Sequence, residues 1–157
     1  MEHDVLVHLR DLLSSSRVLA LAVIVEGEAE AALLPFVTGA DFTAVFVQAS
    51  GLARHSRGLT TGTHVGVLVH APDTPDADPM QLPRLTVQAE VWLLPKGTPE
   101  FTTAANRFAG RFPAAQMTLM LEDFNLYELR LGRGRFVRGF ARAYNVNAHT
   151  FAELSRI

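Results

Sequence analysis

The segment from Arg84 to Leu94 alternates between an apolar set of side chains and a largely polar set. In an extended strand, successive side chains point to opposite faces of the sheet, so this pattern predicts a strand with one face in a core. The polar face would then contact a binding site, a partner or water. The predicted core face consists of Leu85, Val87, Ala89, Val91 and Leu93.

Several other apolar segments have the length and the β-branched composition of strands. They occupy residues 17–25, 34–37, 42–50, 63–71, 125–131 and 134–144. Glu26-Gly27 and the residues around Gly39 predict short turns, and Gly132, Arg133 and Gly134 would join the last two strands. Short connections of this kind favour antiparallel neighbours.

Helical spacing predicts an N-terminal helix over residues 3–16, which Asp4 can cap, and a second helix with Thr98 as its N-cap. Asn147 would cap a closing helix, and the Pro- and Asp-rich residues 71–83 predict a solvated loop. Because the strands do not alternate regularly with helices, a doubly wound parallel sheet is disfavoured. We expect a mainly β (α+β) protein in which six or more antiparallel strands close into a barrel with peripheral helices, since closure removes exposed edges.

The 157 residues fit one domain, residues 1–157, with a single apolar core. A net charge of −2 argues against a general nucleic-acid binder, and no apolar run is long enough to span a membrane. The absence of cysteine excludes disulfides and thiolate chemistry, and nothing resembles a signal peptide. The simplest expectation is a cytoplasmic protein. Lys96 is the only lysine among 14 basic residues, so any anion site would be built from arginine.

The stretch QASGLARHSRG, residues 48–58, places hydroxyl, amide and guanidinium donors between two predicted core strands. Such donors at a corner between a strand and a helical turn can form a phosphate cradle, and they can equally well solvate a surface turn. Arg84, at the start of the alternating strand, could approach from the side. The candidate ligands are Gln48, Ser50, Arg54, Arg57 and Arg84.

The sequence does not indicate a metal site, a catalytic nucleophile or a dinucleotide-binding site. His64 and His70 share a strand but would lie ~20 Å apart, too far to bind one metal ion, so no metal site is expected. The sequence has no Gly-x-Ser-x-Gly nucleophile motif and no Gly-x-Gly-x-x-Gly dinucleotide motif. No residue is nominated as a catalytic acid, base or nucleophile.

The order of four segments resembles the FMN-binding split-barrel superfamily, that is, the pyridoxamine 5'-phosphate oxidase-like proteins. Within it, the resemblance is to the branch related to haem-utilisation proteins. The segments are LLPFV (33–37), QASGLARHSRGL (48–59), PRLTVQAEVWLL (83–94) and FVRGFARAY (136–144).

The resemblance implies a split β-barrel that forms a homodimer, with FMN bound at the interface and contacted by both chains. Pro35, Phe36 and Val37 would lie beside the flavin ring. Gln48 and Ser50 would reach the ribityl chain and the phosphate, with Arg54, Arg57 and Arg84 as charge partners. Gly139, Phe140 and Arg142 would form the closing strand.

Four positions depart from the pattern of the resembled family. Gly51 replaces a basic residue, Gly58 replaces an asparagine, and Ala29 and Ala32 stand in a segment where relatives have a hydrogen-bonding serine. Three functions therefore remain open. They are an FMN-dependent oxidoreductase acting on a small molecule, a flavin-binding protein without turnover, and a haem-binding or haem-utilisation barrel.

Overall fold

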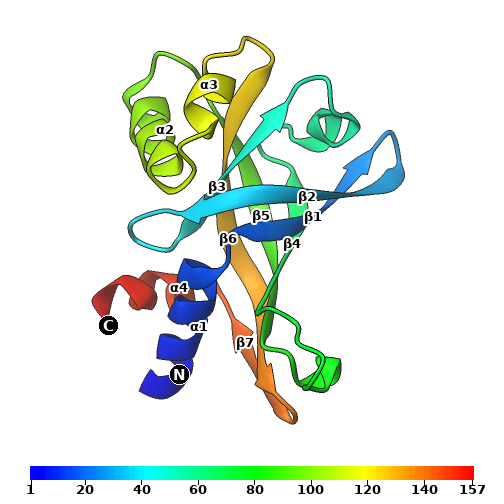
Figure 1. Ribbon diagram of the computed structural model, residues 1–157, viewed down its shortest axis with the longest axis vertical. Coiled ribbons are helices and arrows are strands. Elements are labelled where there is room, and N and C mark those ends of the chain that lie inside the picture. Colours follow the sequence, from blue (N-terminus) through cyan, green and yellow to red (C-terminus); the bar gives the residue numbers. More distant parts are fainter.

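The computed structural model describes residues 1–157 as one seven-stranded antiparallel sheet that closes on itself (Figure 1). The strands follow the order β3-β2-β1-β4-β5-β6-β7, and β3 also pairs with β6. That pairing closes six strands into a barrel, as the sequence predicts, and leaves β7 as an additional strand. The strands are β1 Val18–Val25, β2 Glu28–Thr38, β3 Ala44–Ser50, β4 His64–His70, β5 Arg84–Leu94, β6 Phe124–Gly139 and β7 Arg142–Val146.

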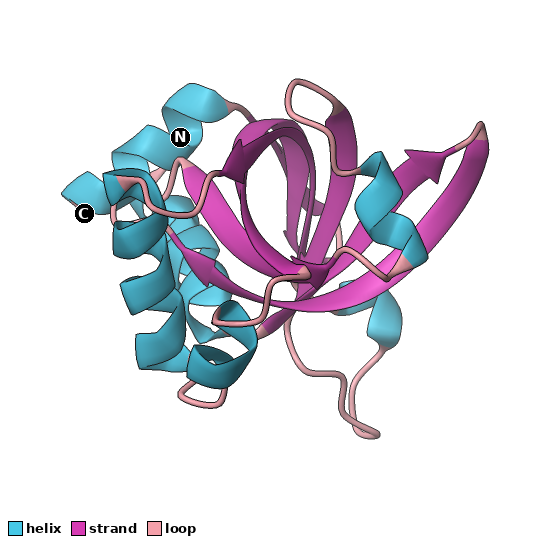
Figure 2. Ribbon diagram, turned by 90° about the horizontal axis from the view of Figure 1, so that it is seen from above, coloured by secondary structure: helices cyan, strands magenta, loops and turns pink.

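The helices lie outside the barrel (Figure 2). Thr98 caps α2 by accepting a hydrogen bond from the backbone of Phe101, and Asn147 and Thr150 form a reciprocal capping box at α4. The predicted caps of α2 and α4 are thus confirmed. None of the helices has the length and apolar character needed to cross a membrane. The helices are α1 His3–Ser15, α2 Pro99–Arg111, α3 Ala115–Leu119 and α4 Ala148–Glu153, with 3₁₀ turns η1 Arg54–Gly58, η2 Pro79–Gln81 and η3 Leu154–Arg156.

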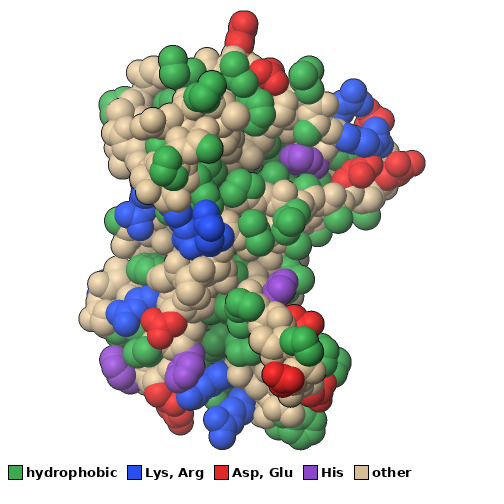
Figure 3. All heavy atoms as spheres, in the orientation of Figure 1, with side chains coloured by type: hydrophobic (Ala, Val, Ile, Leu, Met, Phe, Trp, Pro, Cys, Tyr) green, Lys and Arg blue, Asp and Glu red, His purple; other side chains and the backbone are tan.

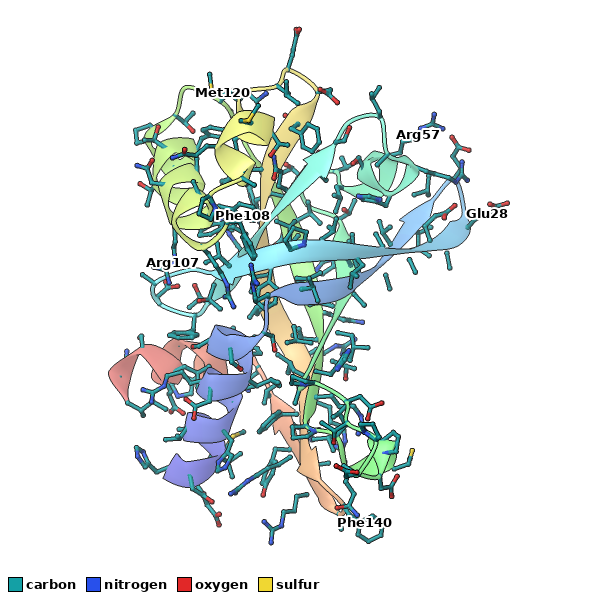
Figure 4. All side chains as sticks on the ribbon, in the orientation of Figure 1. Glu28, Arg57, Arg107, Phe108, Met120 and Phe140 are labelled. Carbon is teal, nitrogen blue, oxygen red and sulfur yellow. The ribbon has the colours of Figure 1, made fainter.

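Two apolar clusters hold the molecule together. The larger cluster fills the barrel and includes the buried stripe of α1. The smaller one lies outside the barrel wall, where α2 and α3 cover the ends of β2, β5 and β6. Phe108 of α2 is completely buried in this second cluster and points toward the barrel wall (Figure 4).

The structure corrects the predicted turn at Gly132–Gly134. Strand β6 runs without a break from Phe124 to Gly139, and the hairpin to β7 lies at Phe140 and Ala141 instead. A Cβ on Gly134 would come within 2.8 Å of the backbone of Val87, beside the register shift between β5 and β6. These glycines therefore permit close approach at a β-bulge rather than a reversal of the chain.

Two further expectations are wrong in detail. The alternation predicts Leu93 on the core face, but it is 40% exposed near the end of β5, whereas Leu94 is buried beneath α2 and α3. Asp4 does not cap α1, because the helix already begins at His3. Its carboxylate instead accepts a 2.6 Å hydrogen bond from Arg138, which lowers the pKa of Asp4.

Candidate functional site

The predicted phosphate ligands at the end of β3 are engaged by their own chain. Gln48 is buried, and its side-chain amide donates a 2.6 Å hydrogen bond to the hydroxyl of Thr118 in α3. The Ser50 hydroxyl donates to the Asp123 carboxylate at 3.0 Å and accepts from the backbone of Leu52. A carboxylate beside Ser50 disfavours a second anion there. The roles of both residues as cofactor ligands stay predictions.

Arg54 and Arg57 lie in η1 against the tip of the β1–β2 hairpin. Arg54 forms ion pairs with Glu30, with Glu28 at 3.4 Å and with Glu26 at 3.9 Å. Glu30 is the main cause of the raised pKa of Arg54. Arg57 pairs with Glu26 at 3.4 Å. Figure 3 shows the opposite charges gathered at this corner, and Figure 4 labels Glu28 and Arg57 there. Neither guanidinium is free of carboxylates in this chain.

Arg84 is far from these groups within one chain. It pairs with Val137 near one end of β6, whereas Ser50 pairs with Phe124 at the other end. The Arg84 guanidinium donates to the backbone carbonyls of Met80 at 3.2 Å and Leu82 at 3.0 Å, and so braces the 71–83 loop. The structure thus brings Gln48 and Ser50 to one end and leaves Arg84 at the opposite end.

Residues 35–37 expose little side-chain surface for a flavin ring. Phe36 is completely buried in the barrel, and Val37 is buried in the cluster under α2. Pro35 is half-buried on the outward face of β2. Contacts of these three residues with a flavin ring stay predictions. They would involve the backbone of the segment or the side chain of Pro35.

The departures from the family pattern have local structural explanations in part. The Gly51 backbone N–H donates to the carbonyl of Asp123 at 2.5 Å, and a Cβ on Gly51 would lie 3.3 Å from that carbonyl oxygen. A side chain at Gly58 would overlap Val23 and come within 2.7 Å of the Ile24 carbonyl, so η1 can pack on β1 only with glycine there. Nothing in the structure explains Ala29.

His55, between these features, has a buried Nε2 atom without a hydrogen-bond partner. Desolvation lowers the pKa of its imidazole, so the neutral form is favoured in the folded protein. It lies in η1 next to Arg54, and it lines neither of the two hollows described below.

An open groove of about 690 Å³ lies elsewhere, on the outward face of the barrel. Its floor consists of the small residues Ala20, Ala22, Ala31 and Gly66, and Leu68 adds further apolar surface. The sequence motifs did not predict this groove. The sequence does contain a pattern that points to it. In residues 18–24 and 64–70, every second residue faces the core, and several of the residues between them, which face outward, are small.

Polar groups line the opposite side of the groove, where β5, β6 and β7 meet. Arg133 donates to the Gln88 side-chain oxygen at 3.3 Å, and Arg135 donates to that of Asn145 at 3.0 Å. Neither arginine has a carboxylate partner, unlike Arg54. Guanidinium groups beside an apolar floor suit a flat, apolar ligand with anionic substituents.

A second hollow of about 650 Å³ adjoins the groove and shares Gln88 and Arg133 with it. It is also lined by His64, Glu90 and Arg130. The Arg130 guanidinium stacks on Trp92, 4.2 Å from the ring centroid. Trp92 is therefore covered by a side chain of its own sheet.

Comparison with known proteins gives the same architecture. The haem oxygenase HutZ of Vibrio cholerae is 26% identical over 141 residues, which cover 88% of this chain and 79% of HutZ. A haem-binding protein from Mycobacterium smegmatis superposes with a TM-score of 0.83 at 24% identity, over 97% of this chain. The chain is a split-barrel protein related to the haem-utilisation branch. This split-barrel protein spans 61% of the length of the M. smegmatis chain.

A flavin-binding likeness is more distant. A FAD-binding protein from Mesorhizobium loti superposes on 82% of this split-barrel protein, with a TM-score of 0.64 and 10% identity. It covers 90% of the length of that structure and indicates a common fold alone. No protein-family model matches the sequence.

Proposed function

We propose that this protein binds haem in the groove on the outward face of β1, β4 and β5. The observation behind the proposal is the pairing of an apolar floor with two arginines that have no carboxylate partner. Haem is a flat, largely apolar macrocycle with two carboxylate substituents on one edge. The relationship to haem-binding and haem-oxygenase proteins supports the same ligand.

The residues of the groove fit haem better than the η1 corner fits a flavin phosphate. Ala20, Ala22 and Gly66 would lie under the macrocycle, and Arg133 and Arg135 would hold the carboxylates. A phosphate at η1 would compete with Glu26 for Arg57 and with three glutamates for Arg54. When bound, haem supplies an iron centre for redox or oxygen chemistry, and the protein contributes binding and orientation.

The proposal concerns haem binding. Haem breakdown would need electrons and oxygen from outside the protein, and no residue here is assigned to that reaction. FMN binding remains the alternative within this superfamily, supported by the split-barrel fold that the M. loti protein shares. It would require the Arg54 and Arg57 ion pairs to open, or a second chain to supply the phosphate ligands.

We also propose a homodimer that uses the same outward face. Leu33 and Ile24 are 70% and 61% exposed on neighbouring strands, beside the floor of the groove. Val18, on the same face of β1, is 47% exposed. Adjacent exposed apolar side chains on a sheet favour burial against a partner, and a second copy is the simplest one. The partner would then cover the open side of the groove.

An absorption titration tests the main proposal. Purified apoprotein is mixed separately with haemin and with FMN, and unbound ligand is removed by gel filtration. We expect haem to stay with the protein at one equivalent per chain and FMN to be lost. Retention of FMN without retention of haem would overturn the proposal in favour of the flavin alternative.

A further inference from the structure

The outward face of β4 presents two histidines in one row with the floor of the groove. Side chains two residues apart on a strand point the same way, so His64, Gly66, Leu68 and His70 share this face. Gly66 and Leu68 line the groove, and one histidine follows at each end of the row. An imidazole is the commonest protein ligand of haem iron. The row therefore offers two candidates.

His64 has the better position. It lines the second hollow, which adjoins the groove and shares the lining residues Gln88 and Arg133 with it. Its neighbour in the row is Gly66, so no side chain stands between the imidazole and the floor of the groove. The Cα atoms of the two residues are only ~7 Å apart at the rise of a strand. His70 lines neither hollow.

The residues opposite the two histidines differ in charge. His64 lies directly opposite Glu90 in the β4–β5 ladder, whereas His70 lies opposite Arg84. Directly opposed side chains have Cβ atoms ~5 Å apart and face the same way. A carboxylate next to a ligating histidine orients the ring and makes it a stronger ligand, while a cation does not. Glu90 lines the same hollow as His64.

The other groups that could bind iron are placed elsewhere. His149 pairs with Glu153 on α4, and His8 bonds to the carbonyl of Asp4 on α1. His55 is in η1, away from both hollows. The chain has no cysteine, and no methionine or tyrosine lines either hollow.

The geometry points to His64 as a ligand of haem iron, with Glu90 as the residue that would position its imidazole. This inference rests on the proposed haem binding. It adds the identity of the iron ligand, which the groove alone does not specify. His64 would hold the iron, and Arg133, which lines both hollows, would bind a carboxylate of the ligand.

Spectroscopy of haem-loaded variants tests the inference. His64→Ala is compared with wild-type protein and with His70→Ala, a matched control on the same strand and face at the other end of the row. Resonance Raman spectra of the ferrous protein report the iron–histidine stretch, and haemin titration reports affinity. We expect His64→Ala to lose that stretch, with added imidazole restoring the histidine-ligated spectrum. Its affinity should fall by about 100-fold, because removing a ligand should cost at least as much as the 10–100-fold lost when an outer-shell partner is removed.

Glu90→Gln should keep the iron–histidine band but shift it to lower frequency, with about a 10-fold loss of affinity. A purely structural role for Glu90 would leave the band where it is. Circular dichroism of each apoprotein shows whether the barrel has formed, so misfolding is recognised independently. His70→Ala should match wild type in both readouts.

The outcomes separate this inference from the haem proposal. If wild-type protein retains no haem, the proposed function fails. If wild type retains haem and His64→Ala shows the same histidine-ligated spectrum, the haem proposal stands and the assignment of His64 is overturned. Loss of the iron–histidine band in His70→Ala instead would also overturn it, by moving the ligand to the other end of the row.

Discussion

Gly58 of η1 lies against Val23 of β1 so closely that a methyl group on the glycine would overlap the valine side chain. The carbonyl of Ile24 would be only 2.7 Å from the added carbon. Because both obstacles belong to the barrel wall, Gly58→Ala must displace η1. We expect a loss of about 1–3 kcal/mol in the free energy of unfolding, as for other overpacked sites. Urea denaturation measures it as a lower midpoint with an unchanged slope.

Gly110→Ala is the matched control for that substitution. Gly110 lies in α2, and a Cβ there would meet no atom within 4 Å. Alanine should therefore raise stability by roughly 0.5–1 kcal/mol through its helix propensity. Equal effects of the two substitutions would show that contact with β1 does not set the requirement for glycine at Gly58.

Arg54→Met leaves Glu26, Glu28 and Glu30 without the guanidinium that lies among them. Repulsion between these carboxylates should lower the thermal midpoint, and salt should reduce the difference from wild type because the groups are exposed. Arg57→Met removes a single pair with Glu26 and should have a smaller effect. Thermal unfolding in low and in high salt checks both. An Arg54→Met defect that does not depend on salt would contradict an electrostatic cause.

His55 should make the stability of the protein fall as the pH drops below about 6.5. Burial lowers the pKa of its imidazole from 6.5 in the folded state. Below that value the unfolded chain binds the proton first, so protonation favours unfolding until the folded pKa is passed. His55→Leu removes this contribution. Chemical denaturation of both proteins between pH 7.5 and about 5 should show a smaller loss for the variant. Parallel curves would contradict the prediction.

Arg133→Gln should weaken haemin binding by roughly 10-fold, the worth of one lost charge-assisted hydrogen bond. Arg142→Gln, on β7 outside the groove, is the control and should leave the affinity unchanged. Both affinities come from the same absorption titration. An equal effect of the two substitutions would indicate general charge attraction rather than a contact in the groove.

Leu33→Asp should favour the monomer if the outward face of β1 and β2 is the dimer interface. Leu33 is 70% exposed, and a carboxylate there would lie in the proposed apolar contact. Leu52→Asp is the control, because Leu52 is also exposed but lies in the turn before η1. Sedimentation velocity measures the shift in mass. A wild-type monomer would refute the dimer directly.

Local patterns in the sequence were enough to predict the barrel. The alternation in Arg84–Leu94 places Leu85, Val87, Ala89 and Val91 in the interior, and Thr98 and Asn147 cap the helices that they precede. These features depend on neighbours within a few residues, so they can be recognised in the chain itself. The resemblance to the haem-utilisation branch agrees with the comparison to HutZ.

The candidate site could not be predicted in the same way. The donors of residues 48–58 have the composition of a phosphate cradle, yet the carboxylates that engage Arg54 come from a hairpin 24 to 28 residues earlier. The groove needs Ala22, Gly66 and Arg133 from three separate strands. No local pattern indicates which arginines keep a carboxylate partner and which do not.

The sequence by itself therefore determined most of the strands, the caps of α2 and α4 and the closed barrel, because hydrophobic periodicity and turn residues act over short distances. Only the tertiary structure decided that Gly132 and Gly134 lie within a continuous strand, since a turn and a close approach of two backbones require the same residue. It also decided which charges are paired and where small residues leave a groove. Both depend on contacts between segments that are distant in the chain.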